Sequence, residues 1–153
     1  ALINNDIDFE VVPGVTSALA APAYAGIPLT HRDYSSSVAI VTGHQAENAE
    51  RVVNWSKLAN SVDTIVILMG VVQLEYIANS LMEGGLDSNT PVAIIEWGTI
   101  KRQRSLIGKL GTIAKDAKER NVKPPAVIVV GEVVKLGRKL SWFKTPLCSK
   151  EEL

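Results

Sequence analysis

The sequence predicts an α/β fold with a mostly parallel or mixed sheet and helices on both of its faces. Short apolar runs alternate with segments of helical spacing along most of the 153 residues, which is typical of α/β domains. The run TIVILM at 64–69 is apolar or β-branched throughout, as in a strand that is covered on both faces. Apolar residues make up 46% of the chain and aromatic residues 5%, so we expect an aliphatic core.

The predicted elements begin with a strand over 9–12 and a helix over 16–25. The first is a short apolar run that ends at the turn signal Pro13-Gly14, and we expect it to be a buried strand. Thr16 is the expected N-cap of the helix, because its hydroxyl can accept a free backbone N–H of the first turn. The later elements are a linker over 26–37, strands over 37–41, 64–69, 91–96, 104–110 and 126–130, and helices over 46–58, 72–83 and 111–120.

Composition limits the partners and the compartment. Acidic and basic residues number 16 each, and this balance argues against the broad basic footprint of a nucleic-acid-binding protein. The single Cys148 excludes an internal disulfide and suits a reducing compartment. No apolar run approaches the roughly 20 residues that a bilayer span needs, and no signal peptide is visible. We therefore expect a cytoplasmic protein without a nucleic-acid or membrane partner.

Three predicted strand ends carry residues that suit a nucleoside-bearing ligand. They are PGVTS at 13–17, MG at 69–70 and WGT at 97–99, and ligands of α/β sheets gather beyond the carboxyl ends of strands. Glycine lets a backbone approach a ligand closely, hydroxyls can hold a ribose, and Met69 offers a polarizable apolar wall. The alternative stays open on spacing alone: the glycines close turns, Thr16 only caps a helix, and Met69 is core.

Four long segments of the sequence closely resemble segments of the uroporphyrinogen-III C-methyltransferases, which belong to the tetrapyrrole methylases. They are VVPGVTSALAAPAYAGIPLTHRDYSSSVAIVTGH (11–44), ILMGVVQL (67–74), PVAIIEWGTIKRQRSLIGKL (91–110) and PPAVIVVGEVVKL (124–136). The resemblance implies S-adenosylmethionine as cofactor, S-adenosylhomocysteine as product and uroporphyrinogen III as substrate. It also implies the second domain of a two-domain enzyme that makes precorrin-2 for siroheme or cobalamin synthesis, and a homodimer.

The resemblance also suggests how the chain is divided and which residues bind the cofactor. Residues 1–30 would be the tail of a preceding domain and a linker, 31–145 the C-terminal α/β domain, and 146–153 a tail. A chain of this kind would be inactive without the preceding half, where the family's acid and base residues lie, so no catalytic residue is named. The implied cofactor-binding residues are Thr16, Ser17, Met69, Gly98 and, as a neighbour, Thr99.

Three arginines are the candidate substrate-binding residues. Arg102 and Arg104 lie in the basic run KRQR at 101–104, and Arg32 lies in the linker. The eight carboxylates of uroporphyrinogen III would suit charge-assisted hydrogen bonds from such residues, while the alternative is a solvated loop. No metal site is expected, because no Cys or acidic residue stands at ligand spacing from His31 or His44.

Two other functions stay open at this point. The chain could belong to another precorrin or cobalt-precorrin methyltransferase, or it could be a non-catalytic interaction module with the same fold. The ending WFKTPLCSK at 142–150 is similar to linkers in proteins that fuse this methyltransferase to a uroporphyrinogen-III synthase, which is therefore a further expected partner.

Overall fold

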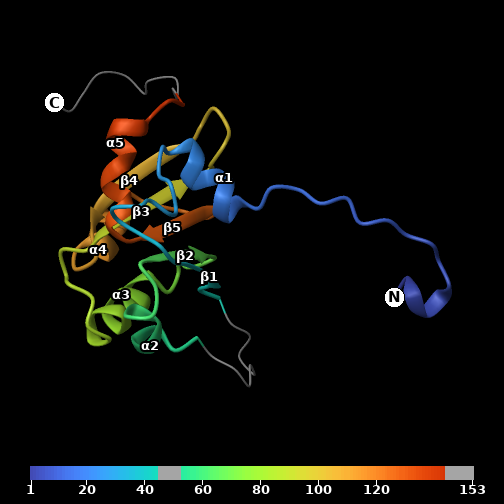
Figure 1. Cartoon of the computed structure of the whole chain (residues 1–153), viewed down its shortest axis with the longest axis horizontal. Coiled ribbons are helices and arrows are strands. Elements are labelled where there is room, and N and C mark those ends of the chain that lie inside the picture. Colours follow the sequence, from blue (N-terminus) through green and yellow to red (C-terminus); the bar gives the residue numbers. More distant parts are fainter. Residues whose placement is uncertain (45–52, 144–153) are drawn as a thin grey trace.

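The computed structural model describes residues 1–44 and 53–143, which fold around a five-stranded sheet of order β1-β2-β5-β3-β4 (Figure 1). The strands are β1 (Val38–Thr42), β2 (Thr64–Leu68), β3 (Pro91–Glu96), β4 (Arg104–Lys109) and β5 (Ala126–Val130). The α-helices are α1 (Ser17–Tyr24), α2 (Trp55–Ala59), α3 (Leu74–Glu83), α4 (Ile113–Glu119) and α5 (Gly137–Leu140). Two 3₁₀ helices span Ile3–Asn5 and Glu132–Leu136.

The sheet is mixed, and this confirms the predicted α/β class in its mixed form. Strands β1 and β2 pair in parallel, whereas β2–β5, β5–β3 and β3–β4 are antiparallel. The residues 97–103 that join β3 to β4 are too few for a crossover, so these two strands form an antiparallel hairpin. Because β2 and β3 both run opposite to β5, strands β1, β2 and β3 share one direction. Their carboxyl ends therefore lie at one edge, beside the start of β5.

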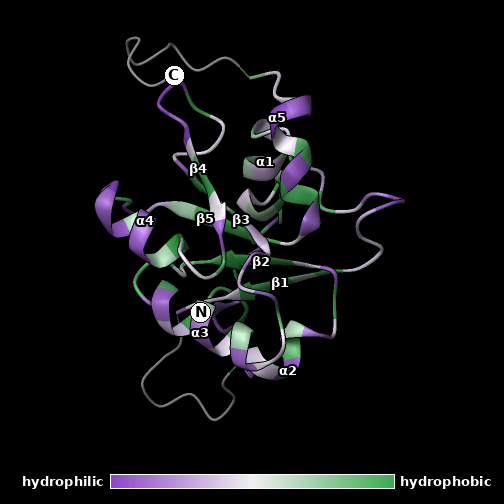
Figure 2. Cartoon of the chain, turned by 90° about the vertical axis from the view of Figure 1, so that its left-hand side faces the viewer, coloured by the Kyte–Doolittle hydropathy of each residue, from purple (hydrophilic) through white to green (hydrophobic). Residues whose placement is uncertain are grey.

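Helices cover both faces of the sheet, as predicted. Helices α2, α3 and α4 pack on one face, whereas α1 and the 3₁₀ helix Glu132–Leu136 pack on the other. Successive residues of β3 alternate between the two apolar clusters, with Ile94 in the first and Ile95 in the second. This explains why the strand is apolar at nearly every position. In Figure 2 strand β2 is mainly green and the outer turns of α4 are purple.

Helix α1 begins where the sequence predicts and joins the main core. The backbone N–H of Ala18 donates to the Thr16 hydroxyl at 3.3 Å, so Thr16 is the N-cap. Ala18 and Ala21 are buried against the sheet, and their small side chains let the helix axis lie close to it. Ile27, just after the helix, belongs to the same cluster. The domain boundary expected after residue 30 stays a prediction.

The strand predicted over 9–12 is wrong. These residues are extended but unpaired, and Phe9, Val11 and Val12 are 54%, 77% and 81% exposed. A strand needs a neighbour to take its backbone hydrogen bonds, and no described segment lies alongside. Figure 1 shows this part of the chain leading away from the sheet toward the N-terminus.

Two further predictions fall partly or wholly on residues that the structure does not describe. Of the helix predicted over 46–58, the structure describes α2 from Trp55, where Asn54 is the N-cap and accepts the N–H of Lys57 at 2.9 Å, whereas 46–52 lie outside the description. The expected tail over 146–153 also lies outside it. In the part of the chain that is described, no helix has the length and apolarity to cross a membrane.

Asp63 anchors the linker to the sheet. Its Oδ2 accepts the backbone N–H groups of Ser36 and Ser37 at 2.8 and 3.1 Å, and both hydroxyls at 2.9 Å. These donors, with the Ser36 N–H as the largest contribution, lower the pKa of Asp63 below its ordinary value. The charged carboxylate thus fixes the entry into β1.

We expect Asp63→Asn to destabilise the chain in a pH-dependent way. A carboxyl whose folded pKa is depressed contributes stability above its unfolded pKa, and that contribution is lost as pH falls through the folded value. The difference in unfolding free energy between wild type and Asp63→Asn should be constant near neutrality and shrink below about pH 4. Urea denaturation at a series of pH values measures it, with Asp8→Asn on the exposed arm as control. A difference independent of pH would contradict the anchoring role.

Candidate functional site

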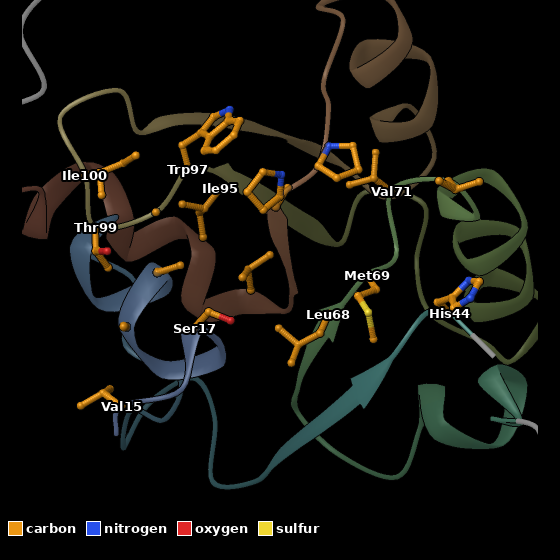
Figure 3. Close-up of a pocket in the computed structure, with 18 of the residues that line it drawn as sticks. Val15, Ser17, His44, Leu68, Met69, Val71, Ile95, Trp97, Thr99 and Ile100 are labelled. Atoms are coloured by element: carbon orange, nitrogen blue, oxygen red, sulfur yellow. The ribbon is translucent and has the colours of Figure 1, made fainter. Parts of the chain in front are cut away.

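A pocket of about 840 Å³ opens at the edge of the sheet where β1, β2 and β3 end. This volume lies in the range of small-molecule sites, roughly 300–1,000 Å³. The walls are mainly apolar and include Leu68, Ile95 and Val127. Polar groups enter from the loop tips around them, as Figure 3 shows for Ser17, Thr99 and His44.

The start of α1 forms one side of the pocket. Val15, Ser17 and Ala21 line it, and the Ser17 hydroxyl points into it (Figure 3). Thr16 stands next to the pocket without lining it, because its hydroxyl is turned back to cap the helix. The cap fixes the first turn, so the position of Ser17 follows from it.

Paired glycines bring the ends of β1 and β2 together. The Gly43 N–H donates to the Leu68 carbonyl at 2.6 Å, and a Cβ on Gly43 would lie 2.5 Å from the Cα of Gly70. Only glycine allows this approach. As a result Met69 and His44, which flank these contacts in sequence, stand at the same rim (Figure 3).

The tip that follows β3 is held in an unusual backbone conformation. Trp97 has φ +51° and Thr99 φ +73°, on either side of Gly98. The Thr99 N–H donates to Oε1 of the buried Gln103 at 2.7 Å, and a Cβ on Gly98 would lie 2.5 Å from the Cβ of Ala21. Left-handed backbone costs a non-glycine residue roughly 1–2 kcal/mol. Such residues cluster at binding sites, and the third of them at this pocket is Met69, with φ +54°.

Next to this tip, the buried carboxylate of Glu96 links the start of β4 to the loop that precedes β5. Glu96 is 3% exposed, and its Oε1 accepts from Arg104 Nη2 at 2.8 Å and from the Lys123 N–H at 2.9 Å. Arg104 Nε contacts the other oxygen, and its Nη2 also donates to the Asn121 carbonyl at 3.1 Å. The hydrogen bond to Glu96 raises the pKa of Arg104 further above its ordinary value. We call Glu96, Arg104, Asn121 and Lys123 the Glu96 clamp.

The structure brings most of the predicted cofactor residues together. Ser17, Met69, Gly98 and Thr99 all line the pocket, with Thr16 adjacent. The convergence of the three loop tips is therefore confirmed, while the binding roles stay predictions.

The three arginines predicted as substrate-binding residues lie in different places. Arg104 belongs to the Glu96 clamp, and Arg32 is exposed in the turn between His31 and Ser35, without lining the pocket. Arg102 is exposed, and its guanidinium carbon stands 3.3 Å from the ring centroid of Trp97, which lines the pocket. Of the three, Arg102 thus has the closest link to the site.

Sequence reasoning missed His44 and the pair Pro124-Pro125 as pocket residues, whereas Trp97 lies in the strand-end segment WGT that it had singled out. His44 directly follows a strand end, so the rule that found the other tips could have found it. The prolines precede an antiparallel strand, and their place depends on a strand direction that the pattern did not predict. Among the described lining residues, His44 is the only ionisable one. No group of three His, Cys, Asp or Glu residues that could hold a metal occurs in 1–44 or 53–143.

Comparison with known proteins decides the family. The sequence profile described as Tetrapyrrole (Corrin/Porphyrin) Methylases matches residues 1–114. The chain belongs to the tetrapyrrole methylase family. It is 51% identical over 134 residues to a uroporphyrinogen-III C-methyltransferase of Priestia megaterium, which covers 88% of this chain and 56% of that protein. It is also 48% identical over 147 residues to a porphyrin biosynthesis protein HemD of Ruminiclostridium josui, covering 95% of this chain and 29% of the relative.

Solved structures of the family share this fold. The uroporphyrin-III C-methyl transferase of Thermus thermophilus complexed with S-adenyl homocysteine has 34% identity and a TM-score of 0.74, over 88% of this chain and 57% of that one. A cobalt precorrin-4 methyltransferase matches with a TM-score of 0.78 at 21% identity, which shows the fold alone. This tetrapyrrole methylase chain is a homologue of uroporphyrinogen-III C-methyltransferases and spans about half the length of the relatives it matches.

We expect Arg104→Met to destabilise the chain by about 2–3 kcal/mol. Removing one partner of a buried ion pair leaves the other charge uncompensated, and the loss is moderated here because Arg104 is half exposed. Urea denaturation measures it. Lys109→Met, at the exposed far end of β4, is the matched control and should cost less than about 0.5 kcal/mol.

A second variant tests the cause. Glu96→Gln combined with Arg104→Met removes the buried charge and should recover part of the lost stability. Equal losses for Arg104→Met and Lys109→Met would show that the clamp contributes nothing.

Proposed function

We propose that this chain forms one wall of the S-adenosylmethionine site of a uroporphyrinogen-III C-methyltransferase. The observation that carries the proposal is the meeting of Ser17, Met69 and Gly98 in one pocket, since these tips match the cofactor contacts implied by the resemblance. The Thermus thermophilus relative in complex with S-adenyl homocysteine supports it.

The pocket residues fit a nucleoside with a short polar tail. Leu68, Ile95 and Met69 offer apolar surface to a base or thioether, while Ser17 and Thr99 offer hydroxyls to a ribose or an amino-acid group. When bound, S-adenosylmethionine supplies a methyl group that is already activated on a sulfonium. The protein's contribution is then chiefly to align a pyrrole carbon with that methyl group and to exclude competing geometries.

Arg102 is the residue of this chain that we assign to the carboxylates of uroporphyrinogen III. It stands beside the pocket and is exposed, so its guanidinium can still form charge-assisted hydrogen bonds. Arg104 is occupied by Glu96, and Arg32 stands away from the pocket. The acid and base residues, and the other cofactor contacts, would come from the part of the relatives' length that this chain does not span.

The proposal for the complete enzyme follows from the family resemblance. The complete enzyme would make precorrin-2 for siroheme or cobalamin synthesis as a homodimer, with a uroporphyrinogen-III synthase as a fused partner in some proteins. This chain alone would be inactive. The likeness to a cobalt precorrin-4 methyltransferase rests on 21% identity and does not favour a later precorrin as the substrate.

The chain should bind S-adenosylhomocysteine weakly, because it supplies one wall only. We expect a Kd on the order of 1 mM, equivalent to about 4 kcal/mol, measured by NMR titration of the chain. Met69→Ala should weaken binding several-fold at little cost in stability, since Met69 is 62% exposed.

Tyr76→Ala is the matched control. Tyr76 is similarly exposed, at 57%, on the neighbouring helix but does not line the pocket, so affinity should not change. Micromolar binding by the wild-type chain would overturn the single-wall proposal. Shifts confined to residues away from the pocket would overturn the site itself.

A further inference from the structure

One face of the Trp97 indole is already occupied by a cation. The guanidinium carbon of Arg102 lies 3.3 Å from the ring centroid, a distance at which a cation is attracted to the π face. Trp97 is also among the residues that line the pocket, and a planar group would stack on the π face opposite Arg102. Among the described lining residues, Trp97 carries the only fused aromatic ring.

The indole is also fixed through its backbone. The Trp97 N–H donates to the Pro125 carbonyl at 3.1 Å, and the residue holds a left-handed φ of +51°. In the sequence, Glu96 of the Glu96 clamp directly precedes Trp97, and Gly98, which lies against Ala21, directly follows it. These contacts fix the backbone from which the side chain projects, and Arg102 packs on the ring itself. Figure 3 shows the indole above Ile95.

We propose that Trp97 is the stacking platform for the adenine base of the cofactor, and that Arg102 is a positioning residue that holds the indole in place. This inference rests on the proposed function and deepens it. Aromatic side chains stack on nucleobases through their π faces, with a loss of about fivefold to a hundredfold in affinity on truncation to alanine.

The pocket favours the adenine base over the tetrapyrrole as the stacked group. In the described chain, no Lys or Arg is among the lining residues, so a polycarboxylate inside the pocket would leave charges without partners, which is costly. The adenine base is flat and uncharged, and the apolar walls beside Trp97 suit it. The carboxylate-bearing substrate therefore belongs at the mouth, where Arg102 is exposed.

The indole N–H signals report the stacking directly. The chain has three tryptophans, Trp55, Trp97 and Trp142, and ¹⁵N NMR of single Trp→Phe variants assigns their three indole signals. Titration of the chain with adenosine, and separately with S-adenosylhomocysteine, should shift the Trp97 signal. The Trp55 signal should stay in place, because Trp55 is buried on the opposite face of the sheet from α1.

Affinity measurements complete the test. Trp97→Ala should weaken S-adenosylhomocysteine binding about tenfold, and Trp97→Phe, which keeps an aromatic face and guards against a folding defect, should lose much less. Trp142→Phe is the control, since Trp142 contacts the far end of α1 through the Ala23 carbonyl, and its affinity should stay within about twofold of wild type.

Arg102 is tested by its effect on an uncharged ligand. Arg102→Gln should shift the Trp97 indole signal in the free chain and weaken adenosine binding several-fold. Arg102→Lys should weaken adenosine binding less, because an ammonium is also attracted to the π face of an indole. If Arg102 acted only on a ligand carboxylate, adenosine affinity would not change.

The outcomes separate this inference from the proposed function. If S-adenosylhomocysteine shifts Ser17 and Met69 while Trp97→Ala binds as wild type, the stacking platform is wrong and the cofactor pocket stands. If uroporphyrin shifts the Trp97 signal and adenosine does not, Trp97 is a tetrapyrrole contact and the inference is overturned. If S-adenosylhomocysteine produces no shift at the pocket, both fail.

Discussion

The pocket depends on the ion pair between Glu96 and Arg104. Glu96 ends β3, Arg104 begins β4, and Lys123 precedes the prolines that lead into β5, so one buried carboxylate joins three segments. Burying a charge is unfavourable unless it is paired and hydrogen-bonded, and here both conditions are met. The loops on either side are thereby fixed, which is why an arginine in a basic run serves the architecture of the site rather than its substrate.

The direction of the strands determines which loops meet. Because β5 runs against both of its neighbours, the ends of β1, β2 and β3 share an edge with the start of β5. Two close contacts then narrow that edge, Gly43 with Gly70 and Gly98 with Ala21. Small residues at these four positions let backbones approach each other, and the space left between the tips is the pocket.

The sequence predicted the strands well where both faces are buried, as at Pro91–Glu96 and Ala126–Val130, because an unbroken apolar run has few other uses. It failed at 9–12, since an apolar run is a strand only beside a partner. The meeting of Ser17, Met69 and Gly98 followed from the strand-end rule, strengthened by a family resemblance. The pairing of Arg104 and the stacking of Arg102 on Trp97 depend on tertiary distances that no local pattern encodes.

The charge distribution around the pocket has a consequence for experiments in different buffers. Within the described residues, His44 is the only ionisable group on the walls, whereas the exposed guanidinium of Arg102 stands just beyond them. Added salt screens exposed charges over a Debye length of about 8 Å at 0.15 M. A neutral nucleoside held by the walls would then be nearly indifferent to ionic strength, whereas a polyanion held at the mouth would be released as salt rises. Varying the salt concentration would therefore separate nucleoside binding from polyanion binding in the same protein.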